Sequence, residues 1–139
     1  MSTELQAKIE LFIDEVWNHG KLAALDEYCA SNVVRQQPPY PTIEGLAAYR
    51  DFVTSTLAIW PDIKMTVEEF IVAGDTVVIR GFWTGTQTGP LRWTNLPPSG
   101  NQVKVAFCEI IHMADGKIAE GFGYHDNLGM LQQLGIESA

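Results

Sequence analysis

Cysteine is scarce in this chain of 139 residues, which contains only Cys29 and Cys108. Two cysteines this far apart form neither the closely spaced pairs of a zinc site nor the multi-bridge framework of small secreted domains. The sequence therefore predicts a protein without a structural metal and without a disulfide scaffold.

Positive charge is also in short supply, because 9 lysines and arginines face 17 aspartates and glutamates and the formal net charge is -8 at pH 7. Such a balance argues against nucleic acid or an anionic membrane surface as the partner. No apolar run approaches the roughly 20 residues of a transmembrane helix, and the first residues lack the basic and apolar regions of a signal peptide. We expect a cytoplasmic protein.

Recognisable catalytic motifs are missing as well. The chain has no Gly-x-Ser-x-Gly, no glycine-rich loop of the kind that binds phosphate, and no cluster with metal-ligand spacing. Nothing in the sequence calls for a cofactor or a metal.

The N-terminal half instead shows helical periodicity. Apolar residues from Leu5 to Trp17 recur with a 3.6-residue period, which predicts an amphipathic helix to about Asn18, ended by Gly20. A shorter helix is expected over residues 21–29 and a third over residues 45–59, stopped by Pro61. An extended piece over residues 32–37 and a proline-rich loop separate the second helix from the third.

The pattern changes to strands after Ile63. Residues 64–72 and 76–85 flank one hairpin connection, and residues 102–113 and 117–126 flank another. A long loop rich in glycine and proline, residues 85–101, lies between the two hairpins. The order predicts one α+β domain over residues 1–139, in which three N-terminal helices cover a curved antiparallel or mixed sheet. A cone of this shape encloses a ligand-sized cavity.

Several short pieces point to a family when they are taken in order. The matching pieces are Val16-Trp17-Asn18 before Gly20, Glu44-Gly45, Trp60-Pro61-Asp62, Gly74-Asp75, Arg80, residues 85–89, residues 97–100, residues 115–120 and the closing stretch from Asp126 to Gly135. The chain resembles the SnoaL-like polyketide cyclase (ester cyclase) branch of the nuclear transport factor two-like superfamily. The resemblance implies the cone-shaped fold, a small-molecule reaction without a cofactor, and a homodimer.

Asp126 is the first candidate for chemistry. The resemblance implies an acid–base aspartate at this position, which removes a proton next to a carbonyl and returns one to the new oxygen. The residues add a reason of their own, because Glu120, Phe122 and Tyr124 share the strand face of Asp126 by the two-residue period. Alternatively, Asp126 caps a helical turn over residues 127–133.

His112 is the second candidate, and its position depends on the hairpin register. A three-residue loop, residues 114–116, pairs His112 with Ile118 and brings His112 to the face of Asp126, where it could stabilise an enolate oxygen. A two-residue loop sends His112 to the opposite face. His125 and His19 are expected at the surface.

Three polar residues are further candidates for substrate binding. Gln36 and Gln87 stand where many relatives of this kind have histidines; glutamine forms hydrogen bonds but does not titrate. Arg80, like Arg35, is a positive residue that forms either a structural ion pair, with Glu109 or Glu120 as candidate partners, or a clamp on a substrate carboxylate.

The four tryptophans suggest what the cavity holds. Trp17, Trp60 and Trp83 belong to predicted helix and strand ends, and Trp93 belongs to the long loop, where it could cover the cavity mouth. For each of them, packing in the core is the alternative and the commoner role of a tryptophan. Together with Phe122 and Tyr124 they favour a small, flat, apolar or aromatic carbonyl compound as the partner.

The leading hypothesis is therefore a cofactor-independent cyclase or isomerase in which Asp126 takes the proton and His112 stabilises the enolate. A non-catalytic module that binds a small hydrophobic compound or serves in dimerisation is the alternative. A steroid isomerase-like activity needs a second carboxyl or a tyrosine near the base, and only Tyr124, Glu109 or Glu120 could serve, which neither their spacing nor the resemblance favours. An epoxide hydrolase-like activity needs an Asp–Arg–Asp set that the chain does not offer. For the homodimer, the open sheet face is expected to carry Val103, Val105, Phe107 and Ile111.

Overall fold

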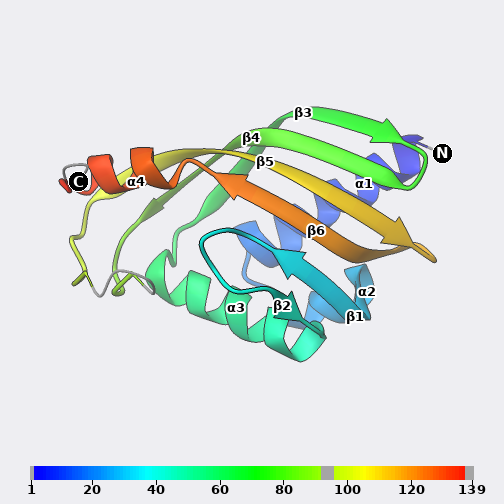
Figure 1. Cartoon of the computed structure of the whole chain (residues 1–139), viewed down its shortest axis with the longest axis horizontal. Coiled ribbons are helices and arrows are strands. Elements are labelled where there is room, and N and C mark those ends of the chain that lie inside the picture. Colours follow the sequence, from blue (N-terminus) through cyan, green and yellow to red (C-terminus); the bar gives the residue numbers. More distant parts are fainter. Residues whose placement is uncertain (1, 92–95, 137–139) are drawn as a thin grey trace.

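Six strands form a single curved sheet in the order β2-β1-β6-β5-β4-β3 (Figure 1). The computed structural model describes residues 2–91 and 96–136. Strand β1 runs parallel to β6, and every other neighbouring pair is antiparallel. The strand bounds are β1 Cys29–Gln36, β2 Ile43–Glu44, β3 Lys64–Ala73, β4 Thr76–Thr86, β5 Gln102–Ala114 and β6 Lys117–His125.

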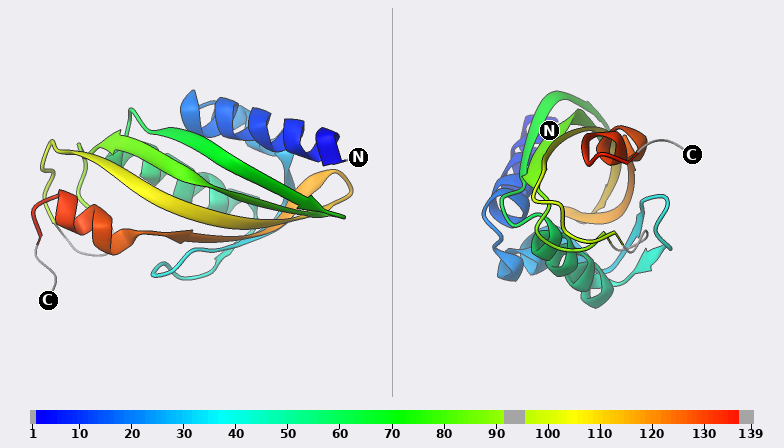
Figure 2. Two further views of the ribbon diagram at one scale, coloured as in Figure 1. Left: turned by 90° about the horizontal axis from the view of Figure 1, so that it is seen from above. Right: turned by 90° about the vertical axis from the view of Figure 1, so that its left-hand side faces the viewer.

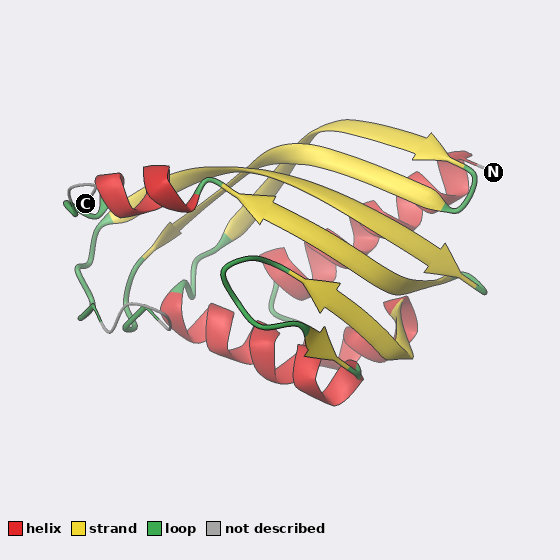
Figure 3. Ribbon diagram, viewed as in Figure 1, coloured by secondary structure: helices red, strands yellow, loops and turns green. Residues whose placement is uncertain are grey.

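Helices cover one side of this sheet, as Figures 2 and 3 show. Helix α1 (Ser2–Phe12) continues into a π-helical segment, Ile13–Asn18, and a short 3-10 turn, Leu22–Ala24, precedes α2 (Leu25–Tyr28). Helix α3 spans Leu46–Ile59, and α4 (Asn127–Gln133) lies at one end of the sheet. The predicted α+β class, the curved sheet and its helical cover are confirmed. None of the described helices is long and apolar enough to cross a membrane.

The predicted elements agree closely with the observed ones. The first helix reaches Asn18 as expected, although its last turn and a half is π-helical, and the second breaks into a 3-10 turn and a single α turn. The four long strands begin where the sequence placed them. Strand β2 was not predicted, because two residues are too few to show an alternating pattern.

Alternation along β5 separates the core from the open side of the sheet. The odd-numbered residues of this strand from Val103 to Met113 are buried, and the even-numbered residues lie on the other face. The expectation for the open face was therefore wrong, because Val103, Val105, Phe107 and Ile111 are all core residues with at most 4% exposure. The concave side of the sheet packs against the helices and is buried, so it takes the bulky apolar residues.

The turn between β5 and β6 and the register shift beside it together decide the position of His112. Ala114 pairs with Lys117, so the connection is the two residues Asp115 and Gly116. Both have positive φ, 52° and 76°, as the tight primed hairpin turns require. A register shift follows between Met113 and His112, which leaves His112 opposite Glu120. Both lie on the face of the sheet away from the helices and the core, which we call the outer face. The three-residue loop was thus wrong, because the connection has two residues. The register shift nevertheless leaves His112 on the strand face of Phe122 and Tyr124, where the three-residue register had also placed it, and this face is the outer one.

Candidate functional site

A cavity opens between the sheet and α3 at the end of the molecule where α4 lies. It is narrow: the centre of a water-sized sphere can occupy about 50 Å³ of it, and the total of about 650 Å³ of empty space includes open solvent. Its apolar lining comes from Trp17, Tyr40, Phe52, Ile59, Trp60, Ile63, Met65, Trp83, Leu91 and Met130. Its polar lining comes from Arg35, Gln37, Thr56, Glu109, His125 and Asn127. The cavity lining is therefore mostly apolar, with a polar group on one wall.

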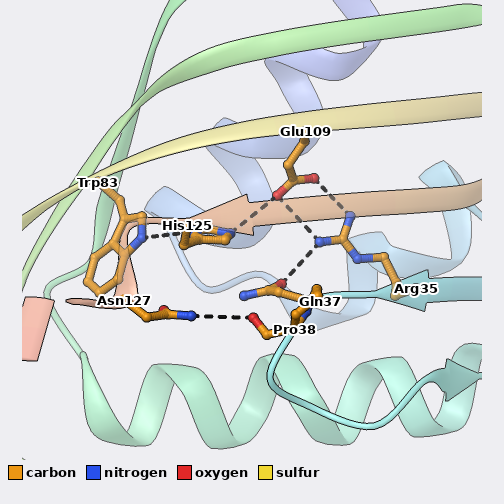
Figure 4. Close-up of polar contacts among 7 residues, drawn as sticks. All are labelled: Arg35, Gln37, Pro38, Trp83, Glu109, His125 and Asn127. Atoms are coloured by element: carbon orange, nitrogen blue, oxygen red, sulfur yellow. Dashed lines mark hydrogen bonds and ion pairs between the residues drawn. The ribbon is translucent and has the colours of Figure 1, made fainter. Parts of the chain in front are cut away.

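Arg35 and Glu109 form the charged centre of that polar wall (Figure 4). The Arg35 Nη1 donates to Glu109 Oε1 at 2.8 Å, and Nη2 donates to Oε2 at 3.3 Å. Nη2 also reaches Gln37 Oε1 at 3.3 Å, and the ring of Tyr49 lies 5.4 Å from the guanidinium carbon. Both charged residues are buried, with 4% and 8% of their surface exposed. A buried pair of this kind is stable only while both partners are present.

Two glycines of β6 make this pair possible. Arg35 sits on β1 opposite Gly121, and Glu109 sits on β5 opposite Gly123, so the arginine must cross β6 to reach its partner. A Cβ at position 121 would lie 2.6 Å from Arg35 Nη1, and one at position 123 would lie 3.2 Å from Nη2. The Gly-Phe-Gly sequence therefore leaves an inward gap across which the guanidinium extends.

His125 completes the polar wall at the end of β6. The Trp83 Nε1–H donates to His125 Nδ1 at 3.0 Å, and the imidazole stacks on Phe107 at 5.6 Å between ring centroids. His125 Nε2 lies 4.0 Å from Glu109 Oε2 and has no hydrogen-bond partner among the described residues. An indole nitrogen only donates, so Nδ1 accepts and the proton of the neutral ring is on Nε2.

Burial and the ion pair set the protonation states. Burial lowers the pKa of His125 to about 4, and although Glu109 favours the cation, the ring is neutral at pH 7. Burial favours the neutral form of Glu109, but the charge and hydrogen bonds of Arg35 outweigh it and lower the pKa of the carboxyl group. Burial also opposes the charge on Arg35, yet Glu109 raises the arginine pKa overall. The wall thus presents a carboxylate, a guanidinium and a neutral N–H donor.

Asp126 and His112 do not line the cavity. Asp126 is exposed and caps α4, where its Oδ1 accepts the backbone N–H of Gly129 at 2.9 Å. This is the helix-cap alternative of the sequence analysis. His112 lies on the outer face, where its Nδ1 and the hydroxyl of Thr76 are 3.1 Å apart. The structure therefore does not bring these two side chains together.

The remaining predicted residues divide between the cavity and other places. Trp17, Trp60 and Trp83 line the cavity. Gln36 is exposed while its neighbour Gln37 lines the cavity. Phe122 and Tyr124 lie on the outer face, and Trp93 is outside the described residues.

Gln87 and Arg80 both have structural partners. Gln87 is 1% exposed and holds the following loop, because Nε2 donates to the carbonyls of Gly89 and Pro97 while Oε1 accepts from the N–H and hydroxyl of Ser99. Arg80 is exposed and pairs with Glu69 at 2.7 Å, so neither Glu109 nor Glu120 is its partner. The ion-pair interpretation of Arg80 fits this contact.

Glu109 and His125 were not chosen as catalytic candidates from the sequence. Glu109 could have been found, because it stands among Val105, Phe107 and Ile111 at inward positions of one strand, and a lone carboxylate in such a row needs a partner. His125 was placed at the surface because Asp126 was placed inside, and adjacent strand residues point to opposite faces. One wrong orientation at the end of the strand therefore put Asp126 inside and His125 outside, the reverse of the observed arrangement.

A curved sheet, a helical cover and an internal cavity define a protein of the nuclear transport factor two-like fold. The family model for the SnoaL-like polyketide cyclases matches residues 7–134, and the chain belongs to that family. A comparison with curated protein sequences found no match to this chain.

Solved structures agree with this membership. A proposed SnoaL-like polyketide cyclase from Jannaschia sp. CCS1 is 25% identical, with a TM-score of 0.87 over 98% of this chain and 94% of that one. TsrD from Streptomyces laurentii is 26% identical, with a TM-score of 0.85 over 97% of each chain. IdmH, a proposed polyketide cyclase from Streptomyces antibioticus, is 26% identical, with a TM-score of 0.77 over 98% of this chain and 99% of that one.

The route of Arg35 across β6 predicts the effect of a single methyl group. Gly121→Ala places a Cβ against a guanidinium that cannot move without breaking its pair with Glu109, so we expect a loss of about 1–3 kcal/mol in the free energy of unfolding. Urea denaturation measures it. Gly123→Ala is the graded control, since its Cβ has more room, and it should cost less. Equal stability of Gly121→Ala and wild type would contradict this route.

Burial of His125 predicts a pH dependence of stability. The unfolded histidine takes up a proton near pH 6.5 and the folded one only near pH 4, so the unfolded state binds more protons between these values. Stability is therefore full above pH 6.5, and we expect it to fall by roughly 2–4 kcal/mol on going down to pH 4. In His125→Asn this fall in the free energy of unfolding between pH 6.5 and pH 4 should disappear. His19→Asn removes an exposed histidine instead, and there the fall should remain. Identical pH profiles for wild type and His125→Asn, from urea titrations, would contradict the prediction.

Proposed function

We propose that this protein is a cofactor-independent enzyme of the cyclase or isomerase kind, which moves a proton next to a carbonyl group of a small compound. The observation that carries the proposal is one carboxylate, Glu109, and one neutral N–H donor, His125, on the same wall of an apolar cavity. Carbonyl chemistry of this type needs a base for the C–H proton and a donor for the developing enolate oxygen. Family membership supports the same class of reaction.

Each polar residue has a role in this reaction. Glu109 removes the proton and returns it, His125 Nε2–H donates to the enolate oxygen, and Arg35 holds the carboxylate in place. Since Arg35 lowers the pKa of Glu109, the carboxylate is a weak base. A weak base removes only a rather acidic proton, such as one between two carbonyl groups. We therefore infer a 1,3-dicarbonyl substrate, as in a polyketide-like ester or an aryl diketone.

Charge and lining define the rest of the substrate. The positive charge of Arg35 is matched by Glu109, and His125 is neutral at pH 7, so the polar wall carries no net charge. An uncharged compound meets no electrostatic penalty there. The aromatic lining from Trp17, Trp60 and Trp83 suits a flat apolar body behind the dicarbonyl group.

Substitution at Glu109 tests the proposal against the base expected from the sequence. Deuterium exchange at the C–H between the carbonyls of an aryl 1,3-diketone, measured by NMR above the buffer rate, should fall at least about 100-fold in Glu109→Gln, because the base is gone. Asp126→Asn should retain the rate, and asparagine also caps helices well, so stability is preserved. If the exchange rate falls strongly in Asp126→Asn and stays at the wild-type value in Glu109→Gln, then Asp126 and not Glu109 is the base.

The second candidate is a binding module without catalysis. It is favoured by one specific observation, that Glu109 and Arg35 already satisfy each other through two hydrogen bonds. Thermal stabilisation by aromatic ketones without any exchange of their C–H protons would support it. A steroid isomerase-like or epoxide hydrolase-like reaction is less well supported, since Glu109 is the one carboxylate among the described residues of the cavity lining.

We also propose that the protein is a homodimer that pairs through the outer face of the sheet. A continuous apolar row, Ile71, Val78, Ile110 and Phe122, crosses β3, β4, β5 and β6 in register. Ile71 is 52% exposed, and Tyr124 in the adjoining row is 53% exposed. Pairing of two such faces would remove this surface from water. The cytoplasmic location expected from the sequence stays a prediction.

Charge at the centre of this row should break the dimer. Ile110→Lys places two buried charges at the proposed interface, so we expect a monomer by multi-angle light scattering where wild type is a dimer. Leu11→Lys is the matched control, because Leu11 is 53% exposed on α1 and outside the row. A dimeric Ile110→Lys variant, or a monomeric wild type, would contradict this interface.

A further inference from the structure

The imidazole of His125 is held from several sides, and its hydrogen bond from Trp83 determines which nitrogen carries the proton. Phe107 stacks on the ring with an interplanar angle of 24°, which fixes its plane but is indifferent to the proton. Trp83 Nε1–H donates to Nδ1 at 3.0 Å, which does depend on the proton. Trp83 is itself fixed, with 7% exposure and an edge contact to Trp60 at 5.0 Å.

The Trp83 contact excludes two of the three protonation states of the ring. The tautomer with the proton on Nδ1 and the imidazolium cation both place an N–H at Nδ1, directly against the indole N–H. Two donors facing each other lose the hydrogen bond and leave a buried donor without an acceptor. Only the tautomer protonated on Nε2 keeps this bond, and Nε2 is the nitrogen without a hydrogen-bond partner, on the side of the carboxylate of Glu109.

We propose that Trp83 is a positioning residue, which fixes His125 as the Nε2–H tautomer so that the cavity presents a neutral hydrogen-bond donor to a substrate oxygen. The tautomer does not depend on the proposed function; the use of the donor for a carbonyl or enolate oxygen rests on it. The ligand class is therefore a compound whose oxygen accepts from N–H. In this state His125 Nε2 has no free lone pair, so it cannot be the base.

The charged groups around His125 agree with this assignment. Glu109 on β5 and Arg35 on β1 are the ionisable residues that shift the charge state of His125, and they oppose each other. Burial lowers the pKa of His125 to about 4, so Glu109 does not draw a second proton onto the ring near pH 7. The pH–activity profile should accordingly show no change near pH 6.5 from the titration of His125.

Nitrogen NMR of ¹⁵N-histidine protein at pH 7 tests the tautomer without any substrate. In wild type we expect the His125 Nδ1 signal to be that of an unprotonated acceptor and the Nε2 signal that of an N–H. Trp83→Phe keeps an aromatic ring but removes the donor, so we expect a tautomer mixture and an upward pKa shift of about one unit. Trp60→Phe is the matched control, with the same substitution in the same cavity, and should leave the wild-type tautomer.

Three results would overturn the inference. They are a wild-type ring protonated on Nδ1, a wild-type imidazolium at pH 7, and an unchanged ring in Trp83→Phe. If Trp83→Phe does not fold, hydrogen exchange of the Trp83 indole N–H in wild type replaces it: slow exchange supports the bond, and exchange at the rate of a free indole overturns it.

Activity separates this inference from the proposed function. On the aryl 1,3-diketone probe, Trp83→Phe should lower kcat about tenfold with little change in KM, since the donor serves the enolate more than the ground state. An inactive wild type with the predicted tautomer would refute the proposed function alone. An active wild type whose Trp83→Phe variant keeps both its tautomer and its kcat would refute this inference alone.

Discussion

The ion pair between Arg35 and Glu109 is the interaction on which the interior of this protein depends. Two charges withdrawn from water are tolerated only when each meets the other in good geometry. Here that condition fixes three strands at once, because the arginine starts on β1, crosses β6 at Gly121 and Gly123, and ends on β5. The parallel pairing of β1 with β6 is thereby joined to the antiparallel β5–β6 hairpin. The polar wall of the cavity is a consequence of this crossing.

Around that pair, the cavity combines an apolar lining with a small set of polar groups whose charges cancel. Glu109 is kept ionised by Arg35, and His125 is kept neutral by burial. Ionised Glu109 has only acceptor atoms and the neutral His125 ring has an N–H donor, and His125 Nε2 lies 4.0 Å from Glu109 Oε2. Both groups lie on the same wall of the cavity, so one small molecule against that wall is within reach of both. This division of roles between a carboxylate and a neutral imidazole is set by environment and not by residue type.

The candidate site shows where reasoning from sequence loses information. The α+β class and the four long strands followed from periodicity and from turn residues, because hydrophobic patterns report which face of an element is buried. Asp126 and His112 failed to meet for a different reason. His112 lies on the strand face of Phe122 and Tyr124, as expected, but this face points outward, while Glu109 and His125 on the other face point to the cavity. Asp126 lies one residue past β6, where the alternation no longer applies and a helix begins.

What the sequence by itself determined is therefore the family, the fold class and the presence of an apolar interior, since these depend on local patterns summed over many residues. Only the tertiary structure decided which polar side chains share the cavity. Arg35, Glu109, Trp83 and His125 come from four different strands, and no spacing along the chain encodes their distances. They meet because the sheet curves and its strands pair in one register, and a pairing of that kind is a property of the whole fold.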